Sequence, residues 1–127
     1  MSKSVDHAAM DAGLSNIADH GDQLHLVSQA PASYADVALY SLGHVGLNTG
    51  IGNGAYALAD GMVSGRRLTL AQQTLPGTAN GVATHAVIID TANSVIKQVT
   101  TAPNYNMQVG VNQAVPPYDV WEIEDPT

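Results

Sequence analysis

The sequence predicts an all-β fold: an antiparallel, jelly-roll-like β-sandwich of about eight strands, with one short helix at the N-terminus. Two observations support this prediction. The apolar side chains are mostly Ala, Val, Leu and Ile, with no Phe and one Trp, and such residues fill the thin space between two sheets well. The 12 glycines and 6 prolines, together with many Asn, Thr and Ser, divide the chain into short segments separated by turns.

The segment 1–21 is predicted to form the helix, as an N-terminal arm. Met10, Leu14 and Ile17 recur at spacings of four and three residues, which places one apolar stripe on a helix. Gly21 offers a left-handed stop at the C-terminal end. Because the stripe is short, we expect the helix to need a partner surface, either the sheet or a neighbouring subunit.

The segment 22–127 is expected to form the sandwich, which makes a single domain together with the arm. A nearly continuous apolar run at 82–89 predicts a central strand that is covered on both faces. The glycine-rich segment 43–54 is the one long irregular stretch, a candidate mobile loop or contact arm. The eight predicted strands span residues 23–28, 37–42, 55–59, 66–72, 82–89, 95–100, 105–112 and 118–123.

Composition argues against several classes of function. The chain carries 4 basic and 11 acidic residues, a net charge of −7, so it lacks the cations that bind nucleic-acid phosphates. The same acidity disfavours anionic lipid surfaces, and no apolar run approaches the roughly 18 residues of a membrane span. Without cysteine, disulfide bonds and thiolate metal sites are impossible.

Two motifs fall short of known signatures. Gly50, Gly52 and Gly54 lack the spacing of a dinucleotide-binding fingerprint, and a strand rather than a helix is predicted after them. Ser64 stands one place late for a nucleophile elbow. We therefore expect a loop at the first motif and a turn at the second.

The histidines raise the question of a metal site. His20, Asp22 and His25 are ligand types that zinc accepts, but structural zinc needs four ligands and no His-x-His or HExxH pattern completes the set. A helix end, with His20 at the negative pole and Asp22 in a turn, is the simpler interpretation. His85, inside the apolar run, is predicted to be a neutral core histidine hydrogen-bonded to backbone. The sequence thus predicts no metal ligand, cofactor site or catalytic residue.

The remaining candidates are contact residues. Arg66 and Arg67 point to opposite faces if they lie on a strand, so one can pair with an acid inside the molecule or across a subunit interface. Trp121 is interpreted first as a core residue and second as an interface anchor. Glu122 and Glu124 indicate a polar strand edge rather than a catalytic carboxylate pair. The candidate interface residues are Met10, Leu14, Ile17, Arg66, Arg67 and Trp121.

Several segments together resemble one family. The most specific are Ser64-Gly65-Arg66 and the run Ala-Thr-His-Ala-Val-Ile-Ile-Asp at 83–90, with looser matches at 22–26 and 117–121. In these segments the chain is similar to the small virion structural proteins of tailed bacteriophages that are encoded beside the major capsid protein. Members with a known place in the particle resemble capsid decoration, or cement, proteins.

The resemblance implies a non-enzymatic protein, without cofactors, that binds the outside of the capsid and stabilises the head. The implied partners are the major capsid protein and further copies of this chain, as a trimer or dimer. Assembly would take place in the host bacterial cytoplasm, and the final location would be the virion. The segment up to Gly21 and the glycine-rich segment are the expected contacts. Two alternatives remain: a tail or fibre component for host recognition, and a small glycan-active enzyme.

Overall fold

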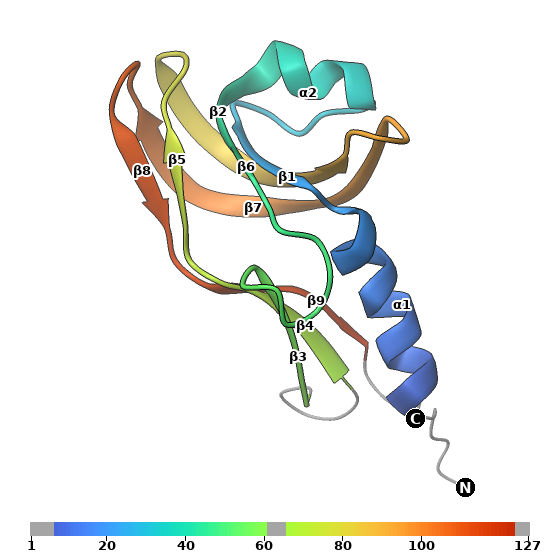
Figure 1. Cartoon of the computed structure of the whole chain (residues 1–127). Helices are drawn as coiled ribbons and strands as arrows, with labels where there is room; N and C mark the ends of the chain where they lie inside the picture. Colours follow the sequence, from blue (N-terminus) through green and yellow to red (C-terminus); the bar gives the residue numbers. More distant parts are fainter. Residues whose placement is uncertain (1–6, 61–65, 124–127) are drawn as a thin grey trace, which may run out of the picture.

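The chain folds into a β-sandwich with two helices (Figure 1). The computed structural model describes the backbone of residues 7–60 and 66–123, and the side chains of 14–59, 66–118 and Val120. Within these ranges it has nine strands, so the predicted all-β sandwich is confirmed, with one more strand and one more helix than expected. The elements are α1 (His7–His20), β1 (Gln23–Val27), α2 (Tyr34–Tyr40), β2 (Ser41–Gly46), β3 (Tyr56–Asp60), β4 (Arg66–Leu70), β5 (Gln73–Pro76), β6 (Gly81–Asp90), β7 (Val95–Met107), β8 (Asn112–Val115) and β9 (Tyr118–Ile123).

One layer is a four-stranded antiparallel sheet in the order β2-β1-β6-β7, here called the main sheet. Strand β6 lies inside it, paired with β1 on one side and β7 on the other. Ala86 and Ile88 belong to the principal core, whereas Val87 and Ile89 pack in a second cluster with Val37 of α2. The prediction of a central strand covered on both faces is therefore confirmed.

The other layer is a long two-stranded ribbon formed by 66–76 and 112–123, with β3 added alongside β4. Leu70 is paired with Tyr118, and Gln73, three residues on, is paired with Val115, three residues back, so the register continues across the gap between the β4–β9 and β5–β8 pairs. Pro116 and Pro117 fall in that gap. Because proline has no N–H to donate, it interrupts the pairing there.

The two layers are tied together along β2 and β5. Gly43 and Gly77 form an antiparallel bridge, and the Thr78 N–H donates to the Leu42 carbonyl at 2.9 Å. On its other side Gly77 lies against the turn 108–111: a Cβ on it would be 2.0 Å from the Gln108 carbonyl oxygen, so only glycine fits at this position. Along the opposite edge, Gln98 Nε2 of β7 donates to the Val120 carbonyl of β9 at 2.9 Å.

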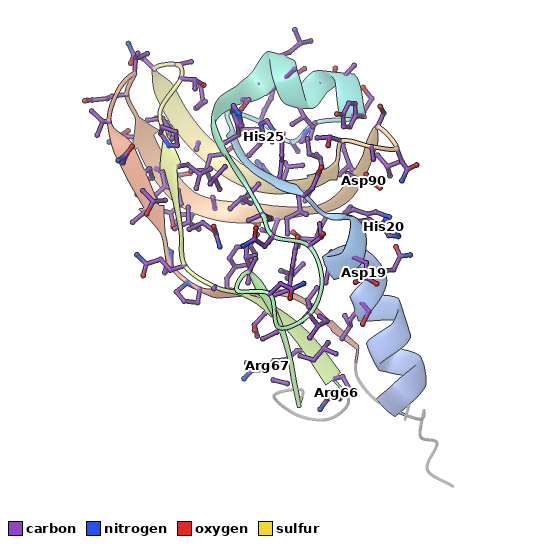
Figure 2. The ribbon with its side chains drawn as sticks, viewed as in Figure 1. Asp19, His20, His25, Arg66, Arg67 and Asp90 are labelled. Atoms are coloured by element: carbon purple, nitrogen blue, oxygen red, sulfur yellow. The ribbon has the colours of Figure 1, made fainter. Side chains whose placement is uncertain are left out.

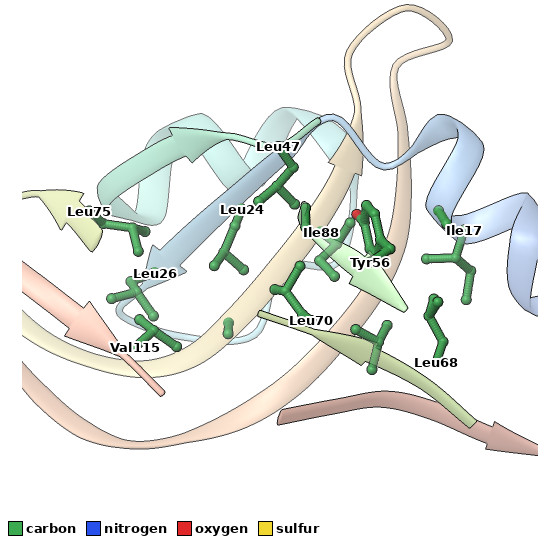
Figure 3. Packing of buried hydrophobic residues seen from close by; sticks show 14 of the residues in the cluster. Ile17, Leu24, Leu26, Leu47, Tyr56, Leu68, Leu70, Leu75, Ile88 and Val115 are labelled. Atoms are coloured by element: carbon green, nitrogen blue, oxygen red, sulfur yellow. The ribbon is translucent and has the colours of Figure 1, made fainter. Parts of the chain in front are cut away.

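The principal core lies between the layers and is built mainly from aliphatic side chains (Figure 3). Leu24 and Leu26 come from the main sheet, and Leu68 and Leu70 come from the ribbon. Among the side chains that the structure describes, Tyr56 is the one large aromatic that is fully buried, and its hydroxyl donates to the Gly21 carbonyl at 2.7 Å. Helix α1 joins the core and packs against β3, β4 and β7.

The predicted strand at 37–42 is wrong. Residues Tyr34–Tyr40 form α2, and the strand that follows is Ser41–Gly46. Tyr34, Val37 and Tyr40 are three residues apart, which puts them on one side of a helix, where they pack on the outer face of the main sheet. Leu39 points away and is 76% exposed. Seven residues hold too few helical repeats for this spacing to outweigh an apolar run.

The predicted bounds of the strands at 95–100 and 105–112 are also wrong. A single strand, β7, runs from Val95 to Met107 and pairs with β6 as the predicted hairpin. Residues 108–111 form a turn rather than a strand. The segment in which Val109 and Val111 alternate with polar residues is therefore a turn, and both valines are exposed.

Gly21 ends α1 for a different reason from the one predicted. Its φ is not positive, and its N–H continues the helix by donating to the Ile17 carbonyl at 2.7 Å. Instead, a Cβ at this position would lie 2.6 Å from both Ile88 Cγ2 and the Tyr56 hydroxyl. Glycine is required by space. In the part of the chain described here, no helix is long and apolar enough to cross a membrane.

Candidate functional site

The predicted interface residues of α1 lie inside the molecule where they are described. Leu14 and Ile17 are 0% and 6% exposed and belong to the principal core. Their burial leaves them no surface for contact with another subunit, which corrects that expectation: the sheet, rather than a neighbour, is the partner that the apolar stripe needed. The side chains of Met10 and Trp121 lie outside the described residues.

Arg66 and Arg67 stand at the start of β4, at the lower end of the ribbon (Figure 2). Both are half-buried. The strand register places Arg66 opposite Asp60 of β3 and Arg67 opposite Glu122 of β9. The side chains of these two acids lie outside the described residues.

A polar cluster surrounds His25 at the junction of β1 and β2. His25 is paired in register with His44, and their rings stack with centroids 4.9 Å apart and planes inclined by 16°. Nε2 of His25 lies 3.0 Å from Gln23 Oε1, and Nδ1 lies 2.8 Å from Ser41 Oγ. His25 is 8% exposed and both of its ring nitrogens have hydrogen-bond partners, so it is a buried, fully bonded ring.

These contacts fix the protons of the cluster. An amide oxygen can only accept, so Nε2 of His25 carries the hydrogen and donates to Gln23 Oε1. In the neutral ring Nδ1 then accepts, and the Ser41 hydroxyl donates to it. Burial, followed by the positive charge that His44 can carry, lowers the pKa of His25 to about 4.

A serine that donates to a neutral histidine has the outline of an activated nucleophile. A base with a pKa near 4, however, is poorly matched to taking a proton at neutral pH. The same Ser41 hydroxyl also donates towards the Gly43 carbonyl, at 3.4 Å within β2 itself, so its one hydrogen is shared between His25 Nδ1 and that carbonyl. This cluster is therefore poorly suited to proton transfer. It is better suited to making the pairing of β1 with β2 depend on pH.

The other residues of the predicted histidine and acid group are separated by the fold. Asp22 accepts hydrogen bonds from the Thr91 N–H, at 3.0 Å, and from the Thr91 hydroxyl, which holds the β6–β7 turn against the end of α1. His20 is the last residue of α1, and its Nδ1 lies 4.0 Å from Asp90 Oδ2 (Figure 2). Among the described residues, no three His, Cys, Asp or Glu side chains form a group that could hold a metal ion.

His85 differs from its prediction. It is half-buried rather than in the core, and its Nδ1 lies 2.9 Å from the hydroxyl of Thr84. That hydroxyl also donates to the Ser28 carbonyl at 3.0 Å, so its one hydrogen is used and His85 Nδ1–H is the donor between the two side chains. The partner is a side chain, where backbone was expected.

The loop 47–55 joins β2 to β3 and carries the glycine motif. Gly50, Gly52 and Gly54 all have a positive φ, and a strand follows them, as the sequence predicted. The Gly50 N–H donates to the Ala18 carbonyl at 2.8 Å, which ties the loop to the end of α1. Ser64 and Glu124 lie outside the described residues, as does the side chain of Glu122.

The most distinctive surface was not anticipated from the sequence. The 4 basic and 11 acidic residues all lie outside two stretches, 68–89 and 98–118. The fold brings these stretches together, because they supply β5, β8 and nearly all of the β6–β7 hairpin. The turn end of that hairpin carries Asp90 and Lys97, whereas the opposite end carries no charge.

This opposite end, formed by 77–82 and 106–112 and here called the uncharged end, lies at the upper left of Figure 1. Val82, Val109 and Val111 are 45%, 63% and 53% exposed there. Amide side chains surround them, and Asn80 Oδ1 accepts from the Val109 N–H at 3.0 Å, which fixes the turn. Apolar groups ringed by neutral polar ones are typical of the centre of protein interfaces, where charged residues are depleted.

Comparisons of the chain with protein-family models, with curated proteins and with solved structures find no match. The sequence held one signal for the uncharged end, the two long stretches without a charge. Which stretches meet depends on the strand order, and that is a property of the tertiary fold.

Proposed function

We propose that this chain is a bacteriophage virion structural protein, a capsid decoration protein that binds the outer shell and stabilises the head. The observation that carries the proposal is the uncharged end with its three exposed valines. The resemblance of several segments to small phage virion proteins supports a phage shell as the surface that it binds.

The charge distribution supports an adhesive role. A protein of net charge −7 is repelled by acidic surfaces and by its own copies. Contact through the uncharged end keeps the charged groups of the α1 side away from the contact, so that burial of valine is not opposed by desolvation of charge. Each such contact is small, and firm attachment follows when a trimer or dimer of the chain engages several shell sites at once. The partners in this proposal are the major capsid protein and other copies of the chain.

The rigidity of the fold suits such a role as well. The ribbon and the main sheet are joined along both edges, by the Gly43–Gly77 bridge and by the Gln98–Val120 hydrogen bond. The uncharged end therefore keeps its shape when free, and little ordering entropy is lost on binding. We place the protein on the virion surface and assign it no catalytic activity.

The test is co-sedimentation of the purified protein with expanded phage heads that lack decoration. Val109→Lys/Val111→Lys introduces two charges on exposed turn residues, and Leu39→Lys is the matched control on α2, on a side chain that is 76% exposed. We expect saturable binding of the wild type and of the control, and at least a tenfold loss of affinity for the double variant.

Absence of wild-type binding, or equal binding of the double variant, would overturn the proposal. Binding to bacterial cells but not to heads would instead favour a tail or fibre component. A glycan-active enzyme would release product from cell-wall or capsular glycans, with no dependence on Val109 or Val111.

A further inference from the structure

Two Asn-Gly pairs occur in the chain, Asn53-Gly54 and Asn80-Gly81. In such a pair the backbone nitrogen of the glycine can attack the side-chain carbonyl carbon of the asparagine before it, because glycine has no side chain to obstruct the approach. The asparagine then loses its amide nitrogen as ammonia. Whether a pair reacts depends on how firmly the fold holds it, and the two pairs are held very differently.

The Asn53-Gly54 pair is exposed and lies in the loop 47–55, between β2 and β3. Within the described residues the Gly54 N–H, which carries the attacking nitrogen, donates to no acceptor. The space beside Gly54 is open, since nothing lies within 4 Å of a Cβ built there. Asn53 Nδ2 donates to the Thr49 carbonyl at 2.7 Å. This bond joins two residues of the same loop, so it does not tie the side chain to a helix or strand.

The Asn80-Gly81 pair is tied to the main sheet. Gly81 is the first residue of β6 and is paired in register with Met107. Asn80 Oδ1 accepts from the Val109 N–H at 3.0 Å, so the side-chain carbonyl that the glycine nitrogen must reach is bound to the turn 108–111. For this pair to react, that hydrogen bond must break and the end of β6 must open. Such local opening has a free-energy cost.

We propose that Asn53 is a site of spontaneous deamidation in the folded protein, and that the fold protects Asn80 from the same reaction. The Gly54 N–H gives up its proton to a base in solution, and its nitrogen forms a bond to Cγ of Asn53. The Cγ–Nδ2 bond breaks, and the amide nitrogen takes up a proton and leaves as ammonia. Water then opens the five-membered imide at either of its carbonyls, and the product is aspartate or isoaspartate at position 53.

Deamidation changes the loop in two ways. It adds one negative charge to the segment 47–55, which has no acidic or basic residue, and it removes the Nδ2–H group that donates to the Thr49 carbonyl. The loop lies beside the end of α1, where the Gly50 N–H donates to the Ala18 carbonyl (Figure 1). Because the C-terminal end of a helix is the negative pole of its dipole, the new charge is unfavourable there. This proposal does not depend on the capsid-binding proposal, since the reaction needs only the chain and water.

The test is storage of the full chain at pH 8 and 37 °C, folded in buffer and unfolded in guanidinium chloride. Peptic digestion at low pH and mass spectrometry then measure the fraction of acid at each asparagine over time. In the unfolded chain we expect similar rates at Asn53 and Asn80, because each is followed by glycine. In the folded protein Asn53 should react at close to its unfolded rate. Asn80 should react about tenfold more slowly than Asn53, the factor that corresponds to breaking one hydrogen bond before the reaction.

Asn53→Gln is the matched variant. Glutamine keeps the side-chain amide but must close a six-membered ring, which forms far more slowly. Ion-exchange chromatography of the stored, folded wild type should show a growing species with one added negative charge, and the variant should lack it. Equal rates at Asn53 and Asn80 in the folded protein, a faster reaction at Asn80, or the same added charge in Asn53→Gln would each overturn the proposal. The two asparagines are compared within one sample, so the result stands even if Asn53→Gln does not fold.

Discussion

His25 and His44 face each other across the β1–β2 pair with their rings stacked, centroids 4.9 Å apart. One ring is buried and the other is exposed. Two imidazoles this close tolerate at most one positive charge well, and the buried ring is the one that stays neutral. The stability of the β1–β2 pairing therefore depends on pH. Strand β2 also forms the edge along which the two layers are joined.

We predict that the folded protein loses stability as the pH falls from about 6.5 towards about 4. The pKa of His25 is about 4 in the folded state and 6.5 in the unfolded chain, so the unfolded chain binds more protons in this window. The difference amounts to about 3 kcal/mol, present in full above pH 6.5. Urea unfolding at a series of pH values measures it. Because carboxylates also titrate there, the comparison is with His25→Gln, whose pH dependence should be flatter by that amount; equal slopes would contradict the prediction.

A second prediction concerns Asp90, which ends the central strand. The Asn93 side chain donates to Oδ2 at 2.7 Å and its backbone N–H donates to Oδ1 at 3.1 Å; the side-chain bond is the main cause of the lowered pKa of Asp90. We expect Asn93→Ala to raise the pKa of Asp90. Carboxyl carbon titration by NMR measures this, with Asp36 in the same spectrum as an internal reference. An unchanged pKa would show that the carboxylate is held by other groups.

The third prediction tests why Gly21 ends α1. A methyl group there would overlap Ile88 and the Tyr56 hydroxyl, so we expect Gly21→Ala to destabilise the fold by about 1–3 kcal/mol. Gly46→Ala is the control, because nothing lies within 4 Å of a Cβ at that position. It should change the free energy of unfolding by less than about 0.5 kcal/mol. Similar changes in the two variants would contradict the prediction, because they would show that the close contacts at Gly21 do not limit which residue fits there.

The elements that the sequence predicts well are those whose signal is local. The apolar run 82–89 can only be a buried segment, and it is β6; the stripe of α1 is visible as spacing alone. Helix α2 is not predicted from the sequence because its inward face consists of only three residues, Tyr34, Val37 and Tyr40. They can be recognised as one face of a helix only when the sheet against which they pack is known. The His25–His44 pair depends on the β1–β2 register, which no local pattern carries. The same holds for the interface residues: Leu14 and Ile17 form an apolar stripe in either setting, and only tertiary packing decides that the stripe faces inward.

The last prediction compares two tyrosine hydroxyls in one molecule. The Tyr56 hydroxyl donates to the Gly21 carbonyl at 2.7 Å in the core, and Tyr56→Phe leaves that buried carbonyl without this donor. We expect a loss of about 1–3 kcal/mol in the free energy of unfolding. The Tyr118 hydroxyl has no partner within the described residues, so Tyr118→Phe removes an unsatisfied buried group and should be neutral or stabilising by up to about 1 kcal/mol. Urea unfolding of both variants under one set of conditions gives the comparison. An equal loss in the two variants would mean that the Tyr118 hydroxyl is satisfied in the free protein.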